Sequence, residues 1–189
     1  MTTTQFPHPE GIFYQAFLPL SWSPITLPVS SSTLSEWMSS NIYMLRALTT
    51  METVPTEKEN EMGAVASMAF ERLETKVDLA LSLLAKLLAQ KVDFPQPVSV
   101  TLAANVIEWV AEEGPEPNTE VALSLHLSNK IPQAIILPAR VTHSERMKDG
   151  LHTRAEFLHL SEEMQDWLER TLFRYHRREI QLRHSGKTS

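Results

Sequence analysis

Residues 56–91 read TEKENEMGAVASMAFERLETKVDLALSLLAKLLAQK, a helix-forming stretch without an internal proline. Its apolar residues recur at alternating steps of three and four, which is the a/d spacing of a coiled coil. The stripe consists of Phe70, Leu73, Val77, Ala80, Leu84 and Leu87, and it is widened on one side by Leu81 and Leu88. Because one neighbouring helix cannot cover so wide a face, the pattern predicts a bundle of three or more helices.

A second amphipathic helix is predicted just upstream of this stretch. Thr33 and Glu36 have the spacing of a capping box, and a/d-spaced apolar residues continue from there to Met51. Since the link between the two helices is short, we expect residues 33–91 to fold back as an inserted antiparallel hairpin whose apolar faces meet other copies. Asn41 has an a-like position in the first helix, where a polar side chain can set the register of a bundle.

After these helices the hydrophobic period changes to that of β-strands. Apolar and polar residues alternate in successive short runs separated by turn sequences. The runs are 98–102, 106–111, 121–127, 135–141 and 153–157. A further strand is expected within residues 11–28, where Pro19 and Pro24 favour an edge position. Short antiparallel strands of this kind, formed by 11–28 and 98–160, close most simply as a six-stranded barrel.

Residues 161–184 are predicted to form a C-terminal helix that covers the barrel, with Ser161 as its N-cap. The predicted fold class is therefore α+β, a six-stranded antiparallel β-barrel with an inserted helical pair and a C-terminal helix, in one domain spanning residues 1–189. The last helix carries Arg170, Arg174, Arg177 and Arg178. These charges form either a solvated face that complements the helix dipole or a site for an anion or an acidic partner.

The composition limits the possible functions. With 189 residues and a formal net charge of -6, the chain has no overall positive field that would attract nucleic acid or an anionic membrane. It has no cysteine, which excludes disulfides and thiolate chemistry. Residues 1–10 lack the pattern of a signal peptide, and no apolar run has the length of a membrane-spanning helix. We therefore expect a soluble cytoplasmic protein.

No pattern typical of an enzyme, a metal centre or a cofactor site is found. The sequence has no nucleophile elbow, phosphate loop or dinucleotide fingerprint. His143, His152 and His159 could approach one another across strands, but they lack metal-ligand spacing. Trp22 and Trp109 have no interleaved basic residues, which favours a place in the core over stacking on nucleic acid. We expect a non-enzymatic protein with no metal and no cofactor.

The strands and the last helix resemble the PilZ domain family, bacterial cytoplasmic barrels of which many are receptors for cyclic di-GMP. The stretches that carry the likeness are 100–109, 118–127, 135–141 and 155–179, and the last is the closest match. The resemblance covers about half of the chain. Residues 33–91 are foreign to ordinary PilZ domains and look like the insertion of an atypical, tetramer-forming branch of the family.

The resemblance also indicates where a ligand would bind. Family members that bind cyclic di-GMP use an Arg-x-x-x-Arg arm before the barrel and an (Asp/Asn)-x-Ser-x-x-Gly stretch on a strand. In this sequence the second motif falls on Thr101, Ala103 and Val106, none of which matches. The arm is missing too, because the first arginine, Arg46, lies inside a predicted helix. Without these charge-assisted contacts, we expect no cyclic di-GMP binding of the usual kind.

Together these features predict a PilZ-like regulatory or scaffold protein that self-associates into a homotetramer through its heptad helices. The apolar stripe could instead pack on the chain's own barrel, but a sustained heptad phase favours self-association. The alternatives are a cyclic di-GMP receptor with a rearranged site and a basic-helix adaptor for nucleic acid. The family resemblance implies a protein partner in a pathway such as surface motility, type IV pilus function or virulence.

Overall fold

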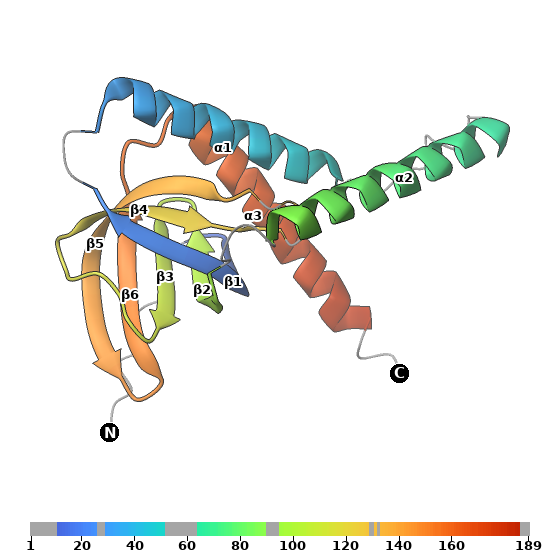
Figure 1. Cartoon of the computed structure of the whole chain (residues 1–189). Coiled ribbons are helices and arrows are strands. Elements are labelled where there is room, and N and C mark those ends of the chain that lie inside the picture. The colour runs from blue at the N-terminus through green and yellow to red at the C-terminus, as the bar shows by residue number, and fades with distance from the viewer. Residues whose placement is uncertain are drawn as a thin grey trace.

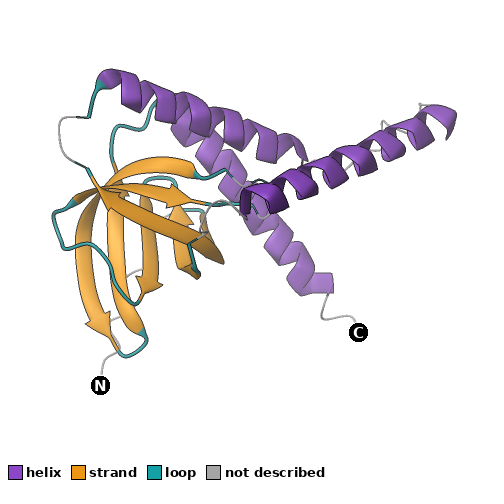
Figure 2. Cartoon of the chain, in the orientation of Figure 1, coloured by secondary structure: helices purple, strands orange, loops and turns teal. Residues whose placement is uncertain are grey.

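The computed structural model describes residues 11–25, 29–51, 64–89, 95–128, 131 and 133–185. Figure 1 shows a β-barrel with three helices outside it. The elements are β1 (Phe13–Pro24), α1 (Ser31–Met51), α2 (Ala64–Ala89), β2 (Pro97–Ala103), β3 (Val106–Ala111), β4 (Glu120–Leu125), β5 (Ile135–Met147), β6 (Gly150–Phe157) and α3 (Glu162–Ser185). In Figure 2 the strands form one body, α1 and α3 lie against it, and α2 extends away from it.

All neighbouring strands of the barrel are antiparallel, and their order is β1-β2-β3-β6-β5-β4. The predicted fold class is confirmed. Apolar residues of the inward-facing phase fill the interior because successive side chains of a strand point to opposite faces. On β3, for example, Ile107 and Trp109 are buried in the core, whereas Glu108 between them faces outward and pairs with Arg154 of β6.

β1 is not an edge strand, so that prediction was wrong. It pairs with β2 from Phe13 to Pro19 and with β4 from Leu20 to Pro24. Pro19 therefore lies where β1 changes partner, and Pro24 is the last residue of the strand. At these two points a missing N–H disturbs the ladder least, which explains how a strand with two partners tolerates both prolines.

α3 closes one end of the barrel. Its first turn is capped as predicted, because the Met164 amide donates to Ser161 Oγ over 3.2 Å. Met164, Leu168 and Leu172 are buried in the same cluster as the barrel core. Tyr175 packs on Tyr14 of β1 with ring centroids 4.9 Å apart.

α1 is capped differently from the prediction. It begins at Ser31 rather than after Thr33, and Ser30 is the N-cap. The Ser30 hydroxyl accepts a hydrogen bond from the Thr33 amide (3.1 Å), and the Ser30 carbonyl accepts one from the Leu34 amide (3.1 Å). A serine-rich stretch offers several possible caps, and the sequence spacing selected the wrong one.

The apolar face of α1 packs within the chain, against α3 and β5. Met44, Leu45 and Leu48 are buried there. Asn41, expected to set the register between copies, is only 1% exposed, and its side chain bonds to β5. Its amide donates to the Ile136 carbonyl (2.7 Å) and its oxygen accepts from the Ile136 N–H (2.8 Å). Asn41 thus fixes α1 on its own barrel.

α2 points away from the barrel in Figure 1. It begins at Ala64, and the predicted first residues of this helix, including Thr56, as well as its predicted end at Lys91, lie outside the described residues. Within the described part of the chain, α2 does not pack along α1 or along the barrel. The predicted antiparallel hairpin is therefore wrong: α1 covers the barrel, and α2 stands apart from it.

Candidate functional site

The apolar stripe of α2 is exposed in the single chain. Phe70 is 57% exposed and Leu84 is 54% exposed, and the side chains of Leu73, Val77 and Ala80 also face solvent. The stripe residues Leu81, Leu87 and Leu88 belong to the helix, but their side chains are outside the description. A contiguous apolar surface of this kind marks an interaction site because water contacts large apolar groups at a free-energy cost.

The exposed apolar surface of α2 is broader than the predicted stripe. Met68 and Leu79 are also exposed, although the heptad phase places them away from the a/d seam. Leu83, at a position flanking the seam, is exposed as well. Spacing analysis missed Met68 and Leu79 because it searched for one seam. Apolar groups around most of a helix suit burial by several neighbours at once.

The surface that corresponds to the family's ligand motif carries an acidic side chain and lacks the motif's residues. Thr101 lies on the outward face of β2 and accepts a hydrogen bond from Gln15 (3.3 Å). Its neighbour on β3 is Glu108, whose carboxylate would repel phosphate. The nearby guanidinium of Arg154 is already 2.8 Å from that carboxylate. Ala103 and Val106, the other motif positions, are buried and apolar.

Arginines of both helices hold α1 and α3 together, and one arginine contact lies within α3. Arg46 of α1 bonds to Glu163 (2.6 Å), and its guanidinium lies 5.2 Å from the ring centre of Trp167. Arg170 lies 5.3 Å from the same ring, and Arg174 donates to the Thr49 carbonyl. These contacts favour a structural role for this part of the basic helix over a preformed anion site. Arg177 and Arg178 are exposed on the same helix.

The three histidines singled out in the sequence do not come together as a site. His143 lies 3.4 Å from Glu145, and His152 lies 2.8 Å from Asp149. His159 occupies a turn with φ of 56° after β6. Among the described residues, no group of three or more side chains is arranged to hold a metal ion.

We expect the Asp149 carboxyl to titrate below its usual range. The hydrogen bond from the His152 ring lowers the pKa of Asp149, and its own backbone amide acts in the same direction. Because the pKa of Asp149 is lower in the folded state than in the unfolded state, this contact stabilises the fold at pH values above the unfolded-state pKa. That stabilisation is lost as the pH falls through the folded-state pKa. Carbon-13 NMR of the side-chain carboxyls should show Asp149 titrating at a higher pH in His152→Ala. Identical titration curves in the two proteins would contradict this contact.

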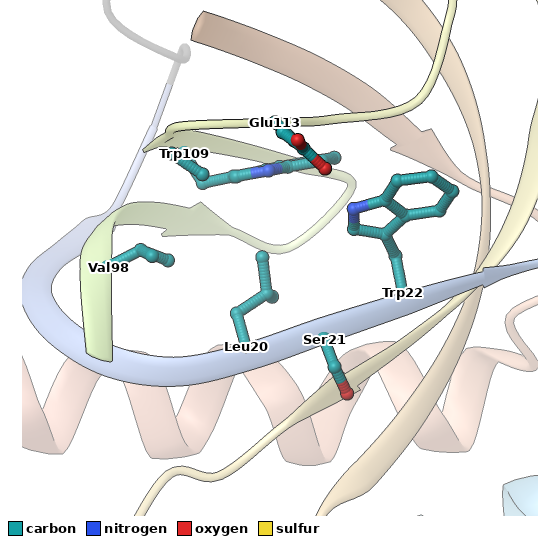
Figure 3. Close-up of a pocket in the computed structure, with 7 residues that line it drawn as sticks. Leu20, Ser21, Trp22, Val98, Trp109 and Glu113 are labelled. Carbon is teal, nitrogen blue, oxygen red and sulfur yellow. The ribbon is translucent and has the colours of Figure 1, made fainter. Parts of the chain in front are cut away.

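One pocket lies at an open end of the barrel. Trp109 forms its buried floor and is 2% exposed, which confirms the predicted core position. Trp22 lines the same pocket but is 37% exposed, so its predicted place in the core was wrong. Figure 3 shows the side chains of Trp22, Trp109 and Glu113 pointing toward one another. Trp22 belongs to the inward-facing phase of β1, but the lack of interleaved basic residues could not show where the interior ends.

The fold is a small β-barrel domain with an appended helix, α2, whose apolar face is exposed. The family model described as "Atypical PilZ domain, cyclic di-GMP receptor" matches residues 45–184. The chain therefore belongs to the atypical PilZ domain family, which confirms the resemblance found in the sequence. The match includes both α2 and the barrel strands from β2 onward.

A solved structure supports the fold. It is a pathogenic protein from Xanthomonas campestris, described as a new tetrameric PilZ domain self-assembled via an unusual helical bundle. It has 24% sequence identity to this chain, covers 90% of it with 91% of its own length, and gives a TM-score of 0.69. None of the curated proteins compared with the chain is a match. None of the helices in the described residues has the length and apolar character needed to span a membrane.

Proposed function

We propose that this protein is a non-enzymatic PilZ scaffold or regulator that assembles into a homotetramer through α2. The observation that carries the proposal is the exposed apolar face of α2. Fully burying one large apolar side chain contributes roughly 1.5–3 kcal/mol, and Phe70, Leu73, Val77 and Leu84 stand exposed on one helix. Packing against other copies removes that cost, and the heptad phase provides the complementary surface.

Four copies are proposed for two reasons. The apolar residues of α2 extend beyond a single seam, which suits more than one neighbouring helix. The solved PilZ structure that shares this fold is itself described as a tetramer built by a helical bundle. In such an assembly α1 and α3 stay on the barrel, so that several barrels are displayed around a core of α2 helices.

The experiment is light scattering coupled to size exclusion, with and without cyclic di-GMP. We expect a ligand-independent mass near four times the 21.5 kDa of one chain. A monomer mass at micromolar concentration would contradict assembly through α2. A mass that changes with the ligand would instead support a receptor.

The second candidate function is a cyclic di-GMP receptor with a rearranged site. It is favoured by the description of the family as a cyclic di-GMP receptor. Arg46 and Arg170, which both lie over the Trp167 ring, also supply the planar groups that recognise guanine and phosphate. Both guanidiniums already have carboxylate partners, Glu163 and Asp166, which weighs against this site.

Thermal unfolding, measured by calorimetry at increasing concentrations of cyclic di-GMP, separates the two functions. A receptor gains thermal stability in proportion to the logarithm of free ligand, whereas the scaffold shows no shift. If binding occurs, Arg46→Ala should abolish it for the Trp167 site, and Arg177→Ala serves as the control on the exposed part of α3.

We further propose a cytoplasmic location and a protein partner in a motility or virulence pathway, following the family context.

A further inference from the structure

The pocket beside Trp22 is lined by residues of β1, β2 and β3 and by Glu113, which follows β3. Tyr14 and Trp22 belong to the same inward-facing phase of β1, near opposite ends of the strand. Tyr14 packs on Tyr175 of α3, whereas Trp22 is 37% exposed. Trp109 and Ala111 continue the inward-facing phase of β3 into the same pocket.

The groups around this pocket suit a positive charge. The exposed indole of Trp22 presents π-electron density, and Glu113 adds a carboxylate, while the buried Trp109 ring lines the same pocket. In the part of the chain that the structure describes, no lysine, arginine or histidine lines the pocket. Arg146 of β5 donates to the main-chain carbonyl of Glu112 (2.8 Å) and does not line it. Among the described residues, no ion pair is formed by Glu113.

The dimensions limit the ligand to a small group. The pocket measures about 250 Å³, below the roughly 300–1,000 Å³ of typical small-molecule sites. It is therefore too small for a dinucleotide and fits a single side chain or a small headgroup. A cation held between the Trp22 indole and the Glu113 carboxylate gains from both cation–π attraction and ion pairing, and the net charge of -6 favours its approach.

We propose that the Trp22–Trp109–Glu113 pocket binds an organic cation, either the arginine or lysine side chain of a partner protein or a small quaternary ammonium. The site is separate from α2, so it stays available in the assembled protein. A partner that inserts a basic side chain here would be recognised by the barrel, while the number of barrels would be set by α2.

The test uses the full chain with 5-fluorotryptophan at all four tryptophans, read by fluorine NMR. The probes are N-acetyl-arginine amide, its neutral isostere N-acetyl-citrulline amide, and choline, at constant ionic strength. We expect arginine to shift the Trp22 and Trp109 signals saturably, with a dissociation constant on the order of millimolar, and citrulline to bind roughly tenfold more weakly. Trp37, on α1, serves as an internal reference.

Matched variants define the site. Glu113→Gln should weaken the arginine probe roughly threefold, and Trp22→Ala roughly threefold to tenfold. Glu112→Gln, which changes the neighbouring carboxylate outside the pocket, should leave binding unchanged. Equal binding of citrulline and arginine, or equal effects of Glu112→Gln and Glu113→Gln, would overturn the proposal. Choline binding as tightly as arginine would assign the site to a small quaternary ammonium, and weaker choline binding to a partner's side chain.

Discussion

The double variant Val77→Asp, Leu84→Asp is expected to be a monomer with a folded barrel. Both side chains lie in the exposed apolar stripe of α2, at positions that the heptad phase places inside a bundle. Burying an unpaired carboxylate costs several kcal/mol, and a tetramer would have to bury two from every chain. The barrel should be spared because α2 does not pack on it. Light scattering measures the mass, and circular dichroism with thermal melting reports the fold.

The control for this variant places the same two charges on the same helix away from the stripe. Thr75→Asp with Ser82→Asp changes positions that the heptad phase assigns to the polar side, and this protein should keep the native mass. The comparison separates loss of the interface from any loss of helix propensity. A native mass for Val77→Asp, Leu84→Asp would mean that the assembly surface lies elsewhere.

Asn41→Leu is expected to lower the free energy of unfolding by about 2–4 kcal/mol. The Asn41 side chain pairs with both the N–H and the carbonyl of Ile136, which precedes the part of β5 that β6 covers. Leucine leaves both main-chain groups without partners, and each buried unsatisfied group costs roughly 1–3 kcal/mol. Urea unfolding of the monomeric Val77→Asp, Leu84→Asp background measures this effect without a contribution from assembly.

Ser39→Leu is the matched control for this substitution. Ser39 is exposed on α1, so the same change of residue type there should alter stability by less than about 0.5 kcal/mol. Equal stability losses for Asn41→Leu and Ser39→Leu would show that the bonds to Ile136 contribute little. A large loss confined to Asn41→Leu would show that one amide fixes α1 on the barrel.

The barrel could be predicted from the sequence because its signal is local. Alternation within each run from β2 to β6 follows directly from the inward and outward faces of a strand. The pairing of β1 with two different strands could not be predicted from the alternation of apolar and polar residues. Pairing of Leu20 with Leu125 and of Phe13 with Ala103 depends on closure of the sheet, and nothing near Pro19 in the sequence reports it.

The helices show a different limit. α1 and α2 carry the same a/d spacing, yet the face of α1 with Asn41 and Met44 is buried within the chain, and the face of α2 with Val77 is exposed. Periodicity identifies an apolar face but not what covers it. The ligand-motif positions could be judged from residue type alone. The pocket at Trp22 could not, because it is lined by residues of three strands and by Glu113.

The double pairing of β1 also has a consequence for the order of folding. β1 is the first strand to be synthesised, but its partners β2 and β4 follow only after α1 and α2. The barrel must therefore close across a long intervening segment, which slows folding through non-local contacts. The entropy of closing a loop grows only with the logarithm of its length, so the segment adds little thermodynamic cost. By the same argument, the sequence-local β2–β3 and β5–β6 hairpins are expected to form before β1 closes the barrel.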